Sequence, residues 1–194
     1  MIVVLGRPGL DADEAIGGQA GRIALAAAQA GGRVELVGSV GDDANGDAVI
    51  TELGRAGIGH AAVLRDPAGQ TRRVDDSEAG PLPRLDSADI DLGLSYLAEC
   101  QVLVIAEALG ADALRVASDA ATYHDAALVV LAEAGTTPPV ELPETATVLE
   151  VPEEDSGAFP ELVGRYAALL DSGRTPADAW RDALDEGGWE QATE

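Results

Sequence analysis

The residues best suited to bind a small ligand lie near the start of the chain. Asp11 follows the first apolar run, residues 2–5, and Gly17 and Gly18 come directly before a stretch with helical spacing. A carboxylate after a first strand can accept two hydrogen bonds from ligand hydroxyl groups, and such charge-assisted bonds are about twice as strong as neutral ones. Paired glycines let the backbone come close to a ligand. A solvated loop acid and a plain helix start are the alternative interpretations.

A second group of candidate residues precedes the helical stretch 159–170. It consists of Glu153, Glu154, Asp155, Ser156 and Gly157. The three acids complement the positive end of the helix dipole, but they also repel any anion that approaches the start of the helix. Asp155 is a candidate proton acceptor, and the amides of Ser156 and Gly157 are candidates for binding phosphate oxygens.

No spacing in the sequence is typical of a metal site. His60, His124 and Cys100 are isolated, so no metal is expected. Cys100 stands just ahead of the apolar run 102–105 and is predicted to be a buried small side chain. Trp180 and Leu184 are four residues apart, which is typical of a helix that docks on a core.

The charge of the chain excludes two classes of partner. Its 12 basic residues are all arginines and stand against 35 acids, which gives a formal net charge of -23. Such a charge repels phosphate backbones and anionic lipid surfaces, so neither nucleic acid nor a membrane is expected as a partner. Because self-repulsion of this size must be screened, the sequence predicts a halophilic protein in a salt-rich cytoplasm.

Length and hydropathy predict one domain without a membrane span. A chain of 194 residues can bury a sizeable core as a single domain, 1–194. No apolar run approaches the roughly 20 residues that a spanning helix needs, and the first residues do not resemble a signal peptide. We therefore expect a cytoplasmic protein.

Apolar runs and helical stretches alternate along the chain, which predicts an α/β fold. Continuous runs that are typical of buried parallel strands occur at residues 2–5, 34–37, 102–105, 128–131 and 147–151. Helical spacing occurs at residues 19–30, 45–56, 90–98, 111–123, 159–170 and 177–184. Residues 61–65 and 70–74 flank a turn with Pro67 and Gly69, and we predict a β-hairpin there, within an inserted lid and linker at about residues 59–85.

The stretch GGQAGRIALAAAQAGGRVELVGSVGDDANGDAVITELGRAGI, from Gly17 to Ile58, closely resembles the N-terminal signature of PfkB carbohydrate kinases. The resemblance implies a three-layer, ribokinase-like (Rossmann-like) sheet flanked by helices, with a small β-hairpin lid that often forms dimers. It also implies that Asp11 holds sugar hydroxyls, that Gly17 and Gly18 form a hinge for lid closure, and that ATP and Mg²⁺ are the cofactors of an active member.

The sequence departs from the family at two places. Arg22 stands where the family usually has a substrate-binding asparagine, so it either selects an anionic ligand or turns outward to pair with an acid. The family's GAGD motif, which supplies a phosphate-binding turn and the catalytic base, is not recognisable. Aligning Ala158 and Phe159 on its end places Gly157 at the base. Aligning residues 152–154 on the family's P-N-E motif instead implies that the nucleotide half is deleted.

The resemblance and these departures together predict a shortened PfkB-family homologue. It would bind a sugar or nucleoside with weak or no phosphotransfer, as a pseudokinase does. One alternative is an active ATP-dependent carbohydrate kinase whose base is Asp155, with Ser156 and Gly157 binding phosphate. The other is a non-catalytic structural or regulatory protein that dimerises through the lid.

The charge leads to a test of folding. We expect the melting temperature, followed by circular dichroism, to rise between low and molar KCl, because the Debye length shrinks from about 10 Å at 0.1 M salt to about 3 Å at 1 M. A melting temperature that stays constant or falls over this range would contradict the predicted adaptation to salt.

Overall fold

The computed structural model describes residues 1–74, 80–97, 99–152 and 157–187. Six parallel strands form one sheet, β1 (Ile2–Leu5), β4 (Val34–Gly41), β5 (Gly59–Asp66), β6 (Val102–Ile105), β7 (Ala127–Glu133) and β8 (Thr147–Val151). The helices are α1 (Gly18–Gln29), α2 (Ala44–Arg55), α3 (Ser87–Ser95), α4 (Ala111–Tyr123), α5 (Ala158–Asp171) and α6 (Pro176–Gly187). All five strands expected from the apolar runs are present, and the sheet contains β5 in addition.

The order of the strands creates a switch point at the centre of the sheet. The order is β5-β4-β1-β6-β7-β8, so the chain builds outward from β1 in one direction and then returns to build from β6 in the other. Loops after β1 and β6 therefore leave toward opposite faces, and a crevice opens at their carboxyl ends. The topology thus predicts a binding site beside residues 6–11 and 106–109.

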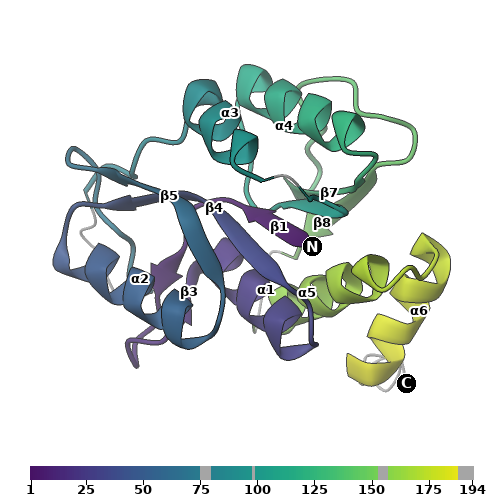
Figure 1. The fold of residues 1–194 in the computed structure, drawn as a ribbon, viewed down its shortest axis with the longest axis horizontal. Coiled ribbons are helices and arrows are strands. Elements are labelled where there is room, and N and C mark those ends of the chain that lie inside the picture. The colour runs from purple at the N-terminus through teal and green to yellow at the C-terminus, as the bar shows by residue number, and fades with distance from the viewer. Residues whose placement is uncertain (75–79, 98, 153–156, 188–194) are drawn as a thin grey trace.

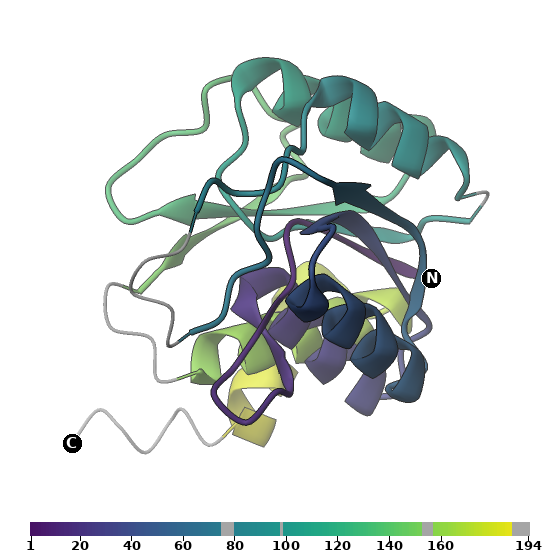
Figure 2. The same ribbon diagram turned by 90° about the vertical axis from the view of Figure 1, so that its left-hand side faces the viewer.

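Helices cover both faces of the sheet and make three layers (Figures 1 and 2). In Figure 1, α3 and α4 lie on one face, and α1, α2 and α5 lie on the other. All four side chains of β1 are fully buried and alternate between the two hydrophobic cores. This burial on both sides explains why the central strands are continuous apolar runs in the sequence.

Close packing of α5 on α1 fixes the start of α5. A Cβ on Gly164 would come within 2.6 Å of the Cβ of Ala26 and 2.7 Å of the carbonyl oxygen of Ile23, so the two helices touch through a position that only glycine can fill. Trp180 of α6 packs edge-on against Tyr166 of α5, with ring centroids 5.4 Å apart. The predicted docking of the last helix on the core is confirmed.

The predicted hairpin at residues 61–65 and 70–74 is wrong. The turn forms, with the amide of Ala68 donating to the Asp66 carboxylate at 3.0 Å, but residues 61–65 lie in β5, which pairs in parallel with β4. The segment after the turn leaves that edge. The antiparallel hairpin of the fold is formed instead by β2 (Gly9–Leu10) and β3 (Ile16–Gly17). Arg73 forms a bridge with Leu10 beside it.

Asp43 is the reason why the segment leaves the sheet edge. One carboxylate oxygen accepts from the amide of Gly46 at 2.7 Å and caps α2, while the other accepts from the amide of Thr71 at 2.9 Å. The hydroxyl of Thr71 in turn accepts from the amide of Gly41 at 2.8 Å. Partial burial raises the pKa of Asp43, but the hydrogen bonds from Thr71 and Gly46 outweigh it and hold the pKa below its ordinary value.

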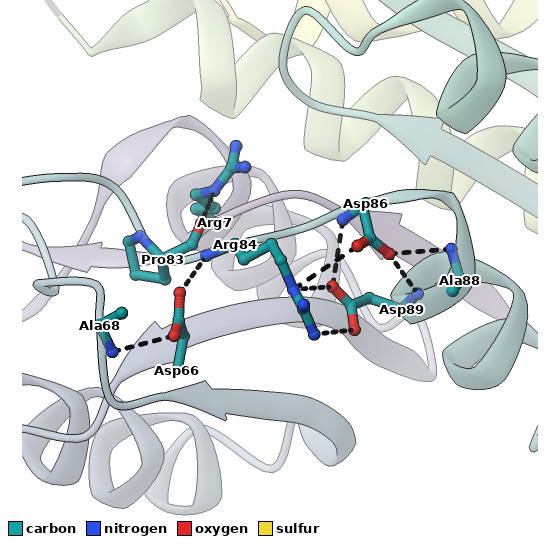
Figure 3. Close-up of polar contacts among 8 residues, drawn as sticks. All are labelled: Arg7, Asp66, Ala68, Pro83, Arg84, Asp86, Ala88 and Asp89. Carbon is teal, nitrogen blue, oxygen red and sulfur yellow. Dashed lines mark hydrogen bonds and ion pairs between the residues drawn. The ribbon is translucent and has the colours of Figure 1, made fainter.

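A polar network leads the chain from β5 into α3 (Figure 3). Asp66 accepts from the amide of Arg84 at 2.6 Å, and the Arg84 side chain lies 3.3 Å from a carboxylate oxygen of Asp89. Asp86 and Asp89 form a reciprocal capping box at the start of α3. This cap begins the helix at Ser87, three residues before the start expected from the sequence, while residue 98 of the expected range lies outside the described residues.

We expect Asp43→Ala to lower the free energy of unfolding by about 1–3 kcal/mol, because it removes a helix cap and leaves the amide of Thr71 without its acceptor. Asp42→Ala is the matched control, since the Asp42 side chain is 63% exposed and lies 3.6 Å from Arg65. Its loss should have little effect on stability. Urea unfolding of the two variants measures the difference, and equal effects would contradict the role given to Asp43.

Candidate functional site

One pocket brings together three of the residues expected from the sequence to bind ligand. Asp11, Arg22 and Gly157 line a cavity of about 470 Å³ between the tip of the β2–β3 hairpin, α1 and the start of α5. The remaining walls are formed by the hairpin, α1 and α5, through Ala15, Ile16, Leu25, Ala26, Gln29, Ala158 and Glu161. Residues that are 11 and 135 positions from Arg22 in the sequence thus share one cavity.

Asp11 is held in place by its own hairpin. Its Oδ1 atom accepts from the amide of Asp13 at 3.1 Å and from that of Ala15 at 2.9 Å, which is the usual way an aspartate closes a turn. Its Oδ2 atom makes no hydrogen bond with the described residues. Asp11 is therefore both a structural turn residue and a fixed carboxylate on the pocket wall.

Gly157 and Arg22 meet at the start of α5. Gly157 is the residue before the helix and has a φ of +89°, in the left-handed region that favours glycine. A Cβ at this position would lie 3.2 Å from the Nη1 atom of Arg22. The half-buried Arg22 side chain thus lies against the positive end of a 14-residue helix. No ion pair joins Arg22 to any residue that the structure describes.

The predicted glycine pair lies outside this pocket. Gly17 pairs with Gly9 in the hairpin, and a Cβ on it would come within 2.5 Å of the carbonyl carbon of Leu10. Gly18 begins α1 and lines a separate cavity of about 180 Å³ at the switch point. The two glycines therefore join the hairpin to α1 and leave no room for side chains there.

Arg7 and Glu107 form an ion pair at the switch point. Each is the second residue after a central strand, β1 or β6, and the amide of Arg7 donates to the Glu107 carboxylate at 3.0 Å. The Arg7 side chain also donates to the carbonyl of Pro83, as Figure 3 shows. Burial raises the pKa of Glu107, although the Arg7 amide and guanidinium favour its charged form. The sequence analysis missed this pair.

The remaining candidates have different outcomes. Asp155 and Ser156 lie outside the described residues. Within the described part of the chain, no group of three or more His, Cys, Asp or Glu side chains could hold a metal ion. Cys100 is buried as predicted, and its desolvation raises the pKa of the thiol to about 11. No described helix is long and apolar enough to cross a membrane.

Comparison with known proteins gives matches among solved structures alone. No sequence family profile matches the chain, and no curated protein matches it. An E. coli protein provisionally named ribokinase II, in complex with ATP and Mg²⁺, superposes with a TM-score of 0.68 at 14% identity, over 96% of this chain and 91% of that one.

Two further kinases match over similar lengths. Aminoimidazole riboside kinase from Salmonella enterica, complexed with aminoimidazole riboside and an ATP analogue, gives a TM-score of 0.69 at 11% identity and covers 96% of this chain and 90% of that one. The tetrameric inhibited form of phosphofructokinase-2 from Escherichia coli gives 0.67 at 16% identity, over 96% and 92%. The chain therefore has the ribokinase-like carbohydrate-kinase fold over nearly its whole length, and the expected fold class is confirmed.

The raised pKa of Glu107 leads to a prediction about stability and pH. Because ionisation of Glu107 is less favourable in the folded than in the unfolded chain, its contribution to stability is complete below its ordinary pKa and is lost as the pH rises through the raised value. Between about pH 4 and pH 7, wild type should lose more stability than Glu107→Gln. Denaturant unfolding at several pH values measures this. Glu99→Gln, at a 71% exposed side chain, is the control and should run parallel to wild type.

Proposed function

We propose that this chain binds a sugar or nucleoside in the pocket of Asp11, Arg22 and Gly157 and transfers phosphate weakly or not at all. The observation that carries the proposal is the position of Gly157. It lies at the start of α5, in the same cavity as Asp11, where the resemblance to PfkB kinases places the proton acceptor. A glycine has no side chain to accept a proton.

The binding half of the proposal rests on Asp11. Its carboxylate is oriented by two backbone amides through Oδ1, so little side-chain entropy is lost when Oδ2 binds a hydroxyl group. The β2–β3 hairpin that carries Asp11 is bonded to residues 72–74, since the amide of Val74 donates to the carbonyl of Leu10 at 3.0 Å. This small β element is our candidate for the lid of the site.

The residues at the pocket fit a phosphate group better than they fit catalysis. Arg22 lies beside Gly157 at the start of α5, and its guanidinium favours an anionic group in this part of the pocket. Residue 157 itself has no side chain to accept a proton, and the described residues include no cluster of ligands for Mg²⁺. Binding without efficient transfer is what these residues support.

The second candidate function is an active ATP-dependent carbohydrate kinase. It is favoured by the nearly full-length likeness to a protein solved with ATP and Mg²⁺. Its base would be Asp155, with Ser156 and Gly157 binding phosphate. Four other expectations stay predictions. They are a dimer formed through residues 59–85, a single domain over residues 1–194, a salt-rich cytoplasm and a purely structural role.

A coupled ATPase assay over a panel of sugars and nucleosides in molar KCl tests the two functions. We expect turnover at background level together with ligand-induced rises in melting temperature. Turnover that disappears in Asp155→Ala would overturn the proposal and favour the active kinase. No thermal shift with any sugar, nucleoside or nucleotide would favour the structural role.

Asp11→Asn tests the binding half separately. An asparagine oxygen can still accept from the amides of Asp13 and Ala15, so the hairpin should persist while the charge-assisted bonds to ligand are lost. We expect ligand affinity to fall by about 10-fold to 100-fold in calorimetric titrations. Asp13→Asn changes the same charge on an exposed neighbour and should leave affinity unchanged. Equal affinities of the two variants would remove Asp11 from the site.

A further inference from the structure

Arg22 stands out from the other arginines of the chain. Ten of the twelve lie within 4 Å of a carboxylate among the described residues, as expected in a chain with 35 acids. Arg22 and Arg72 are the two exceptions, and neither forms an ion pair within the described part of the chain. Arg72 is exposed, whereas Arg22 is half-buried in a pocket wall. The expectation that Arg22 turns outward to pair with an acid is therefore not met by any described residue.

The two acids that line the same pocket are engaged elsewhere. Asp11 accepts from its own hairpin amides. Glu161 lies 3.6 Å from Arg165, one turn further along α5, and is 63% exposed. The guanidinium of Arg22 lies instead beside Gly157, against the positive end of α5. A cationic side chain without a carboxylate partner among the described residues therefore lines the pocket, and a carboxylate or phosphate group of a ligand would supply that partner.

The hydrogen-bonding capacity of Arg22 narrows the class of ligand. A guanidinium only donates, and its planar fork matches the two oxygens of a carboxylate or phosphate. Asp11, by contrast, only accepts and therefore suits hydroxyl groups. The pocket thus offers a hydrogen-bond acceptor, Asp11, on the hairpin and a forked donor, Arg22, on α1. A neutral sugar would bind Asp11 through its hydroxyls but would match the guanidinium of Arg22 poorly.

We infer that the ligand of this pocket is a polyhydroxylated anion, a sugar phosphate or sugar acid, whose hydroxyls bind Asp11 and whose anionic group binds Arg22. The inference rests on the proposed function and specifies its substrate class. Arg22 is then the residue that determines specificity, since a shorter neutral side chain would leave the pocket suited to uncharged sugars. The anionic group is part of the sugar ligand itself, so binding of this ligand requires no nucleotide.

Calorimetric titration without nucleotide tests the inference. The probes are matched sets that share a carbon skeleton, namely glucose, gluconate and glucose 6-phosphate, ribose and ribose 5-phosphate, and adenosine and adenosine 5′-monophosphate, each in low and in molar KCl. For wild type, we expect the anionic member of at least one set to bind about 10-fold or more tightly than the neutral member. Gluconate and glucose 6-phosphate distinguish a carboxylate from a phosphate.

Arg22→Gln should reduce binding of the anionic probe by about 10-fold to 100-fold and leave the neutral member of the set within about 3-fold of wild type. Arg33→Gln is the control, because it removes the same charge from a side chain that is 68% exposed and lies outside this pocket. It should change neither affinity. Circular dichroism checks that both variants keep the fold.

The outcomes separate this inference from the proposal beneath it. If neutral sugars bind as tightly as their anionic counterparts, or if Arg22→Gln affects both equally, the pocket binds sugar but Arg22 is a solvated arginine only, and the inference is wrong. If inorganic phosphate alone binds as tightly as the sugar phosphates, Arg22 binds a simple anion and the polyhydroxylated class is wrong. If no probe binds at all, the proposed function fails together with the inference.

Discussion

The contact between α1 and α5 determines what the site can contain. Gly164 lies so close to Ala26 and the carbonyl of Ile23 that no side chain fits at residue 164. Helices that touch at such short range cannot slide past one another without a steric clash. The first turn of α5 is thereby held beside Arg22, one turn before Ala26 on α1. Gly157, which is distant in the sequence, becomes a wall of the same cavity as Asp11 for this reason.

Positive charge is scarce in this chain, so its placement carries information. Most arginines serve to neutralise acids, as Arg84 does between Asp86 and Asp89 near the start of α3. At the switch point Arg7 is committed to Glu107, in a partly buried pair whose carboxylate is held by the Arg7 amide as well. Arg22 is the exception among the half-buried ones. Among the described residues that line the pocket, Arg22 is therefore the one side chain that brings positive charge.

Sequence patterns predicted the elements of the fold well, because each depends on local periodicity. The continuous apolar runs became the central strands, and residues 111–123 became α4 with the expected bounds. The position of the hairpin was wrong, because it depends on a long-range hydrogen bond from Thr71 to Asp43 that no local pattern encodes. The turn at residues 66–69 was correctly recognised, but the partner of the strand after it was not.

The sequence named three residues that meet in the candidate pocket, and their role in binding stays a prediction. Asp11, Arg22 and Gly157 were identified from the resemblance to PfkB kinases, and the structure places them in one cavity. Their shared cavity could not be foreseen from their spacing. Arg7 and Glu107 were missed, although each follows a buried run by two residues. Only the parallel pairing of β1 with β6 brings those two positions together.

Asp43 is the second aspartate of the GDD signature, and the backbone of the chain itself occupies its carboxylate. Both oxygens of Asp43 are occupied by backbone amides of the chain itself, and the neighbouring Gly41 and Gly46 are packed against Thr71 and Asp43 with no room for a side chain. This part of the signature is therefore required by architecture. A genome search based on this part of the signature would therefore collect chains with this fold whether or not they turn over a substrate.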